Sequence, residues 1–126
     1  ELIPENSIWR QENNMPIIKS DDRQQGRFPE GFLFSAWGVG RFSSGEECDY
    51  HYHDCDEYWF ILEGRAMVTE DGVEYEVGPG DCVFTPMGTE HKIKAITDCA
   101  EFWCELELRG DKRPGHLHRN EVTQNR

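Results

Sequence analysis

Residues 31–109 consist of short segments rich in aromatic and β-branched residues, with Gly, Pro or Asp between them. Short strands joined by tight turns are typical of a β-sandwich or β-barrel, so the sequence predicts an all-β fold. The Asp71-Gly72 pair is a typical two-residue turn of a β-hairpin. No stretch combines the length and the period of a helix. The expected strands cover residues 32–42, 49–53, 57–62, 65–70, 73–77, 81–85, 91–96 and 100–108.

The segment 100–108 shows the clearest period of two, and residues two apart on a strand point to the same face. One set of alternating residues is apolar and the other is mainly acidic. We therefore predict that the first set is buried and that the second mostly faces water. The apolar set is Ala100, Phe102, Cys104, Leu106 and Leu108, and the second set is Glu101, Trp103, Glu105 and Glu107.

The chain of 126 residues has the length of a single domain, within which three parts differ in composition. Residues 1–30 mix short apolar pieces with a polar run, which predicts an N-terminal arm with one or two short strands. Residues 31–109 form the expected barrel. Residues 110–126 are polar and have no apolar face, so we expect a loosely held tail in which His116 and His118 are solvated.

Charge and composition exclude several kinds of partner. The sequence has 13 Lys and Arg against 25 Asp and Glu, a net charge of -12. Such a surface repels nucleic-acid phosphates and anionic membranes. There is no apolar run that could span a bilayer, no signal-peptide layout at the N-terminus, and no Cys-x-x-Cys among the five cysteines. We therefore expect a cytoplasmic protein with reduced thiols and no nucleic-acid or membrane partner.

A His-x-His pattern carries the main chemical signal. His51 and His53 are two residues apart, so on an extended strand both imidazoles project to the same face. Glu57 shares their parity and can reach the same point after the bend at 54–56. Two neutral imidazoles and one carboxylate are suitable ligands for a divalent metal ion.

A second stretch supplies a third imidazole. Gly80-Asp81 opens a strand, Pro86 closes it, and Gly88 permits a tight turn that returns the chain at His91. Three imidazoles and one carboxylate leave open positions on the metal for water or substrate, which is typical of a catalytic site. The predicted metal ligands are His51, His53, Glu57 and His91.

These two stretches resemble the signatures of the cupin family. The first signature, G-x5-H-x-H-x3,4-E-x6-G, is matched in full from Gly45 to Gly64. The second, G-x5-P-x-G-x2-H-x3-N, is matched from Gly80 to His91 and fails only where Ala95 stands instead of Asn. The resemblance implies a single-domain cupin β-barrel, a double-stranded β-helix of the jelly-roll type. It also implies that the four residues named above hold one metal ion.

The resemblance further implies a range of functions. Metal-dependent cupins act on small oxygen-bearing organic substrates. Fe would support a dioxygenase, whereas Mn, Ni or Zn would support an isomerase, epimerase, decarboxylase or lyase. Glu57 is the only anionic ligand, so it is the candidate general base if it leaves the metal. The alternative is a cupin that binds or senses a small molecule without turnover.

Strand parity outlines the pocket around the metal. Trp59 and Ile61 share the face of Glu57, Ile93 shares that of His91, and apolar Phe84 is expected opposite. The expected pocket lining is therefore Trp59, Ile61, Phe84 and Ile93. This lining has few cations, so a neutral or modestly charged substrate fits better than a sugar phosphate.

Assembly is expected from the arm. A small barrel leaves exposed strand edges that must be paired or covered. Cupins commonly dimerise through N-terminal strands, and residues 2–18 contain the apolar side chains to do so. The sequence therefore predicts a homodimer.

Overall fold

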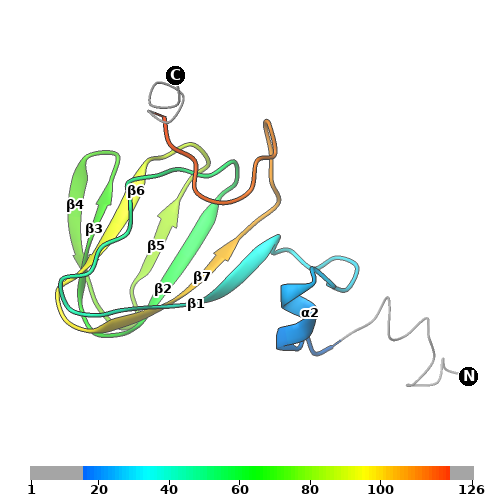
Figure 1. Ribbon diagram of the computed structural model, residues 1–126, viewed down its shortest axis with the longest axis horizontal. Coiled ribbons are helices and arrows are strands. Elements are labelled where there is room, and N and C mark those ends of the chain that lie inside the picture. Colours follow the sequence, from blue (N-terminus) through cyan, green and yellow to red (C-terminus); the bar gives the residue numbers. More distant parts are fainter. Residues whose placement is uncertain (1–15, 120–126) are drawn as a thin grey trace, which may run out of the picture.

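The computed structural model describes residues 16–119, and its strands form two sheets (Figure 1). The strands are β1 (Ala36–Phe42), β2 (Glu57–Glu63), β3 (Ala66–Glu70), β4 (Val73–Val77), β5 (Cys82–Thr85), β6 (His91–Ala95) and β7 (Cys99–Glu105). One sheet has the order β1-β7-β2-β5 and the other has the order β4-β3-β6. All these pairings are antiparallel. The predicted all-β barrel fold is confirmed.

Side chains from both sheets meet in one core. Trp59 and Ile61 from β2 belong to the same buried cluster as Val68 from β3 and Ile93 from β6. The intervening residues of β2 are more exposed, which gives the alternation expected of a strand with one buried face. Each fully buried side chain of this size stabilises the fold by about 1.5–3 kcal/mol. The core therefore holds the two sheets together below the histidine end of the barrel.

Two connections show why glycine is required where it occurs. Asp71 and Gly72 have φ angles of 50° and 84°, as a two-residue hairpin turn with two left-handed residues requires. The predicted hairpin between β3 and β4 is confirmed. Gly64 has a φ of 77°, and a Cβ at this position would lie 1.9 Å from the carbonyl oxygen of Asp98. Glycine at 64 therefore lets the β2–β3 connection pack against the turn before β7.

The predicted strand at 49–53 is replaced by isolated bridges. His51 pairs with His91, the first residue of β6, and Glu47 pairs with Lys94. β1 also begins later than predicted, at Ala36 instead of at 32. The segment before β2 therefore follows β6 closely enough to place its side chains, without forming a continuous ladder.

β7 ends at Glu105, earlier than the predicted 108. Beyond this residue the amide of Leu106 donates to the carbonyl of Asp56, and the amide of Arg109 donates to that of Asp54. After Glu105 the backbone amides of this segment therefore donate to the loop at 54–56 instead of to a neighbouring strand, and the sheet ends there.

The described part of the N-terminal arm contains a helix instead of the predicted strand. In α2 (Ser20–Gln24) the amide of Lys19 donates to the Asp22 carboxylate at 2.9 Å, which caps the first turn. Arg23 ties the helix to the barrel by donating to the carbonyl of Trp37. The strand prediction is wrong for residues 16–30, because the backbone hydrogen bonds of this polar run are made within the run itself.

Residues 1–15 of the arm lie outside the described residues. The homodimer, which depends on them, remains a prediction. Within residues 16–119 no helix has the length and hydropathy to cross a membrane.

Candidate metal centre

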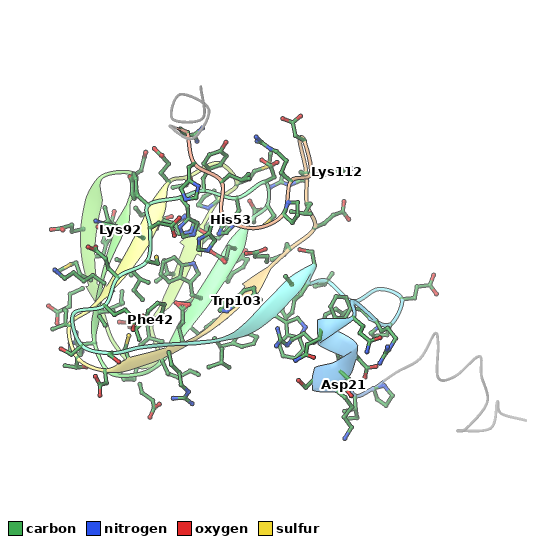
Figure 2. All side chains as sticks on the ribbon, in the orientation of Figure 1. Asp21, Phe42, His53, Lys92, Trp103 and Lys112 are labelled. Carbon is green, nitrogen blue, oxygen red and sulfur yellow. The ribbon has the colours of Figure 1, made fainter. Side chains whose placement is uncertain are left out.

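Three histidines meet at one end of the barrel, where Figure 2 labels His53 beneath the C-terminal segment. His51, His53 and His91 are 4%, 3% and 1% exposed. One ring nitrogen from each lies within 4.8 Å of the other two. The backbones of His51 and His91 exchange N–H···O bonds of 3.0 and 2.8 Å. This bridge brings the loop before β2 to the start of β6 and sets the rings side by side.

Backbone carbonyls fix the orientation of each imidazole. Because a carbonyl only accepts hydrogen bonds, each Nδ1 carries the proton and each Nε2 presents a lone pair when the ring is neutral. The Nε2 atoms of His53 and His91 are buried and have no hydrogen-bond partner within residues 16–119. The Nδ1 acceptors are the carbonyls of Asp49 for His51 (2.7 Å), Gly115 for His53 (2.9 Å) and Thr89 for His91 (2.9 Å).

The Glu57 carboxylate lies against two of these imidazoles. Its Oε1 is 3.4 Å from Nε2 of His53 and 3.3 Å from Nε2 of His91. Burial raises the pKa of Glu57, but the two imidazoles outweigh burial and hold the pKa well below its usual range. Burial likewise lowers the pKa of His53, but the Glu57 and Glu105 carboxylates outweigh it and raise the pKa. The Glu57 carboxylate is therefore ionised, and its charge favours a positive charge on the neighbouring His53 imidazole.

His51 is held in its neutral form. Burial lowers its pKa to about 4, against the opposing effect of its bond to the Asp49 carbonyl, and the neighbouring imidazoles add to the lowering. A neutral imidazole is the form that binds a metal ion. His51 is thus suited to be a ligand at neutral pH.

The four residues fit a divalent metal ion. Oriented imidazoles and an ionised carboxylate are the donors that Fe, Mn, Ni and Zn take in proteins. A buried polar atom without a partner costs about 1–3 kcal/mol. Bonds from Nε2 of His53 and His91 to a cation would remove that cost. The structure thus brings all four predicted ligands to one place.

Two further carboxylates on β7 are buried, contrary to the prediction that their face mostly meets water. Glu101 and Glu105 are 7% and 9% exposed. Oε2 of Glu105 lies 3.6 Å from Nδ1 of His53, and Glu105 forms a second group of close ligand atoms with His53 and Glu57. Phe102, from the set predicted to be buried, instead has its ring 6.2 Å from that of the exposed Phe60.

The prediction for β7 is wrong for Glu101 and Glu105 and confirmed for Ala100 and Cys104, which are 1% and 3% exposed. Alternation separates two faces of a strand without saying which of them lines a cavity. The acidic set points into the cavity, and its members Glu101, Trp103 and Glu105 are all part of the lining. Trp103 was the available signal, because a large indole ring among the acidic set is unusual for a solvent-exposed face.

A cavity of about 430 Å³ opens beside the histidines. Trp59 and Ile93 line it, together with Trp103, which Figure 2 labels beside β7 and β1. The other two predicted lining residues are corrected. Ile61 packs in the core and is not part of the lining. Phe84 is 44% exposed and stacks on Tyr58 outside the cavity, because Val83 and Thr85 are the inward residues of β5.

The C-terminal segment, residues 109–119, crosses the histidine end of the barrel (Figure 1). The His116 ring stacks on that of His51, with centroids 3.5 Å apart and an interplanar angle of 7°. His116 and His118 both contact the Asp49 carboxylate. Although partial burial opposes it, these hydrogen bonds lower the pKa of Asp49 to about 2. The prediction of a loosely held tail with solvated histidines is therefore wrong for 110–119, and residues 120–126 lie outside the described residues.

Two contacts anchor the C-terminal segment. The Arg113 amide, Nε and Nη2 donate to the Asp54 carboxylate at 3.0, 2.8 and 3.1 Å. These bonds lower the pKa of Asp54, which is only 4% exposed. Leu117 forms an antiparallel bridge with Tyr52, with two N–H···O bonds of 2.9 Å. No sequence pattern indicated this pairing, because it joins distant parts of the chain through single residues.

A model of the cupin domain family matches residues 38–103, just over half of the chain. The chain belongs to the cupin family. The matched part runs from β1 to β7 and contains the three histidines and Glu57. The C-terminal segment of this cupin lies outside it.

Curated relatives of this cupin match it only in part. It is 46% identical over 70 residues to the uncharacterized protein y4oW of Sinorhizobium fredii, covering 55% of this chain and 32% of that protein. It is 35% identical over 54 residues to dimethylsulfoniopropionate lyase DddW of Ruegeria pomeroyi, covering 43% and 36%. The chain thus spans about a third of the length of these relatives.

Solved structures share the fold. The crystal structure of a predicted oxalate decarboxylase from Thermotoga maritima superposes with a TM-score of 0.55 at 23% identity. The match covers 59% of this chain and 66% of that one. At this identity the likeness extends to the fold alone.

Proposed function

We propose that this cupin is a mononuclear metal-dependent enzyme that acts on a small oxygen-bearing organic substrate. His51, His53, Glu57 and His91 are the proposed ligands of one Fe, Mn, Ni or Zn ion. When bound, such an ion supplies a Lewis acid that polarises a coordinated oxygen. The lyase among the similar proteins supports an enzyme. Lyase, dioxygenase and isomerase or epimerase activities are the classes to test.

The Nε2 atoms of His53 and His91 carry this proposal. Both are buried without a hydrogen-bond partner within residues 16–119, and both lie within 3.4 Å of the same carboxylate oxygen. A structural histidine in a barrel core normally satisfies both nitrogens. Two unsatisfied nitrogens aimed at one carboxylate are better explained by a metal ligand set.

Glu57 is the proposed general base. It is ionised, 6% exposed, and part of the cavity lining. A carboxylate that leaves the metal can take a proton from a bound substrate. Glu57→Gln should keep most of the metal and lose turnover, and a variant with full turnover would rule out this role.

Metal content tests the site directly. Protein purified without a His-tag or chelator should contain about one equivalent of metal by elemental analysis, following the single predicted ligand set. The His51→Ala/His91→Ala double variant should contain none. If neither protein binds metal after reconstitution, the proposal fails.

Turnover then separates an enzyme from the alternative, a cupin that binds or senses a small molecule. Metal-loaded protein is assayed with substrates of the three classes, and the double variant serves as the control. A protein that binds such compounds through its metal without converting any of them would favour the sensing alternative. The identity of the bound metal narrows the reaction class. Fe would favour a reaction with dioxygen, whereas Mn, Ni or Zn would favour proton transfer or elimination.

A further inference from the structure

The cavity beside the histidines is lined by acids and indole rings. Glu57, Glu101 and Glu105 contribute carboxylates, and Trp59 and Trp103 contribute the indoles. No Lys or Arg in the part of the chain that the structure describes belongs to the lining. The whole chain carries a net charge of -12. Away from the metal, this cavity therefore repels an anionic group and attracts a cationic one.

Paired side chains on β2 and β7 form successive rows along the cavity side of the sheet. The rows are Glu57 with Glu105, Trp59 with Trp103, and Ile61 with Glu101. Glu101 is four residues from Glu105, which is about 13 Å of extended strand. The histidines and two carboxylates thus lie at one end, an indole row follows, and Glu101 lies beyond it.

Within residues 16–119 the Glu101 carboxylate has no polar partner. It is 7% exposed, and no residue among 16–119 donates a hydrogen bond to its carboxylate or forms an ion pair with it. Burial, with a smaller contribution from the charge on Glu57, raises the pKa of Glu101 to about 7. Because buried carboxylates are normally paired, a cationic group of a ligand is the partner that this position lacks.

Two glycines of β1 make room for this arrangement. A Cβ at Gly38 would lie 3.1 Å from the Trp103 ring, and a Cβ at Gly40 would lie 3.3 Å from Cγ of Glu101. Glycine in a strand often marks such a close approach. Trp103 and Glu101 therefore pack against the β1 backbone while still lining the cavity. The face of an indole ring attracts cations, most strongly when they are desolvated.

We propose that this cavity binds the positively charged group of a small zwitterionic substrate, an ammonium-type cation held by the Glu101 carboxylate and the Trp103 ring. The oxygen-bearing end of the same molecule lies toward the histidines and Glu57. The inference rests on the proposed function and adds the charge of the substrate to it. The anionic oxygen end of such a substrate would meet the positively charged metal ion at one end of the cavity. Its cationic end would meet the Glu101 carboxylate at the other end.

A matched pair of probes tests this. One probe is the trimethylammonium derivative of propionate, and the other has tert-butyl in place of trimethylammonium, which keeps the shape and removes the charge. Binding to the full chain is measured by calorimetry, in zinc-loaded and in chelator-treated protein. We expect the charged probe to bind at least about tenfold more tightly.

The preference should depend on Glu101. Glu101→Gln keeps the size of the side chain and removes its charge, so the preference should fall to about threefold or less. Glu74→Gln changes an exposed acid on β4 and should leave the preference as in the wild type. The wild-type comparison of the two probes needs no variant, so it stands even if Glu101→Gln fails to fold.

The outcomes separate this inference from the proposed function. Equal binding of the two probes, binding of neither, or a preference that survives Glu101→Gln would overturn the cation site, even if zinc binds. Failure of the proposed function would instead appear as absence of zinc binding. In that case a preference for the charged probe in chelator-treated protein would still support the cation site.

Discussion

Two His-x-His tripeptides, 51–53 and 116–118, lie side by side in this cupin and have different surroundings. Their central residues, Tyr52 and Leu117, form an antiparallel bridge. Both imidazoles of the first tripeptide are buried, and their Nδ1 atoms donate to backbone carbonyls. The imidazoles of the second are 49% and 34% exposed and contact the side chain of Asp49.

The difference shows what distinguishes a candidate metal ligand from a supporting histidine. Spacing is the same in both tripeptides, so spacing cannot be the reason. In the first, carbonyl acceptors take the Nδ1 protons, and His53 keeps a buried Nε2 free to face Glu57. In the second, the rings lie beside an exposed carboxylate and one of them stacks on His51. The second tripeptide therefore supports the first.

The sharpest test of this comparison removes one histidine from each tripeptide. His53→Ala should lower zinc affinity by more than the roughly 10–100-fold that changes in outer-shell partners cause, because it removes a proposed ligand. His118→Ala should leave the affinity within about threefold of the wild type. Competition with a chromophoric chelator measures both, and thermal unfolding checks that both variants fold. Equal losses of zinc affinity would mean that the two tripeptides do not differ in their contribution to metal binding.

A second test concerns the acid at the far end of the cavity. The unfolded chain ionises Glu101 above its ordinary pKa of 4.5, whereas the folded protein keeps it protonated up to about 7. The folded state therefore binds the extra proton in this window, and the free energy of unfolding falls as pH rises through it. Glu101→Gln should remove this loss, which amounts to about 3 kcal/mol above the folded pKa.

Chemical unfolding at several pH values in the presence of chelator measures this effect. The exposed Glu107→Gln serves as the control and should follow the wild type. A difference between Glu101→Gln and the wild type that does not change with pH would contradict the prediction.

A third test loosens the C-terminal segment. Arg113→Ala removes two of the three donors to the buried Asp54 carboxylate, Nε and Nη2, and keeps the backbone amide, so the free energy of unfolding should fall by about 2 kcal/mol. Arg109→Ala breaks a more exposed pair with Asp56 and should cost less than about 1 kcal/mol. Denaturant titration gives both values. Similar losses would mean that burial of Asp54 does not set the strength of the anchor.

The smallest expected effect concerns the stack of His116 on His51. His116→Ala should lower zinc affinity by less than about tenfold, because a stacked pair contributes about 0.5–1.5 kcal/mol and only orients a ligand. His116→Phe keeps a ring in place and should recover most of the affinity. The visible spectrum of the cobalt-loaded protein should change in the alanine variant more than in the phenylalanine variant. Identical spectra would remove His116 from any positioning role.

The fold was predictable because it depends on local signals. Turn residues such as Asp71-Gly72 and the alternation of β2 mark strands and their ends without information from distant parts of the chain. The common side of His51 and His53 also followed, because residues of equal parity share a face, whereas His91 meets them through the bridge between His51 and His91. The placement of Phe84 did not follow, because parity within a strand leaves open which face is inside.

Sequence by itself determined the all-β class, the main strands and the common side of His51, His53 and Glu57, because each depends on spacing along a few neighbouring residues. Tertiary structure decided that the acidic face of β7 lines a cavity and that 109–119 closes over it. These features arise from contacts between segments far apart in the chain, such as Arg113 with Asp54. Single side-chain contacts of this kind have no periodicity, so only the folded chain reveals them.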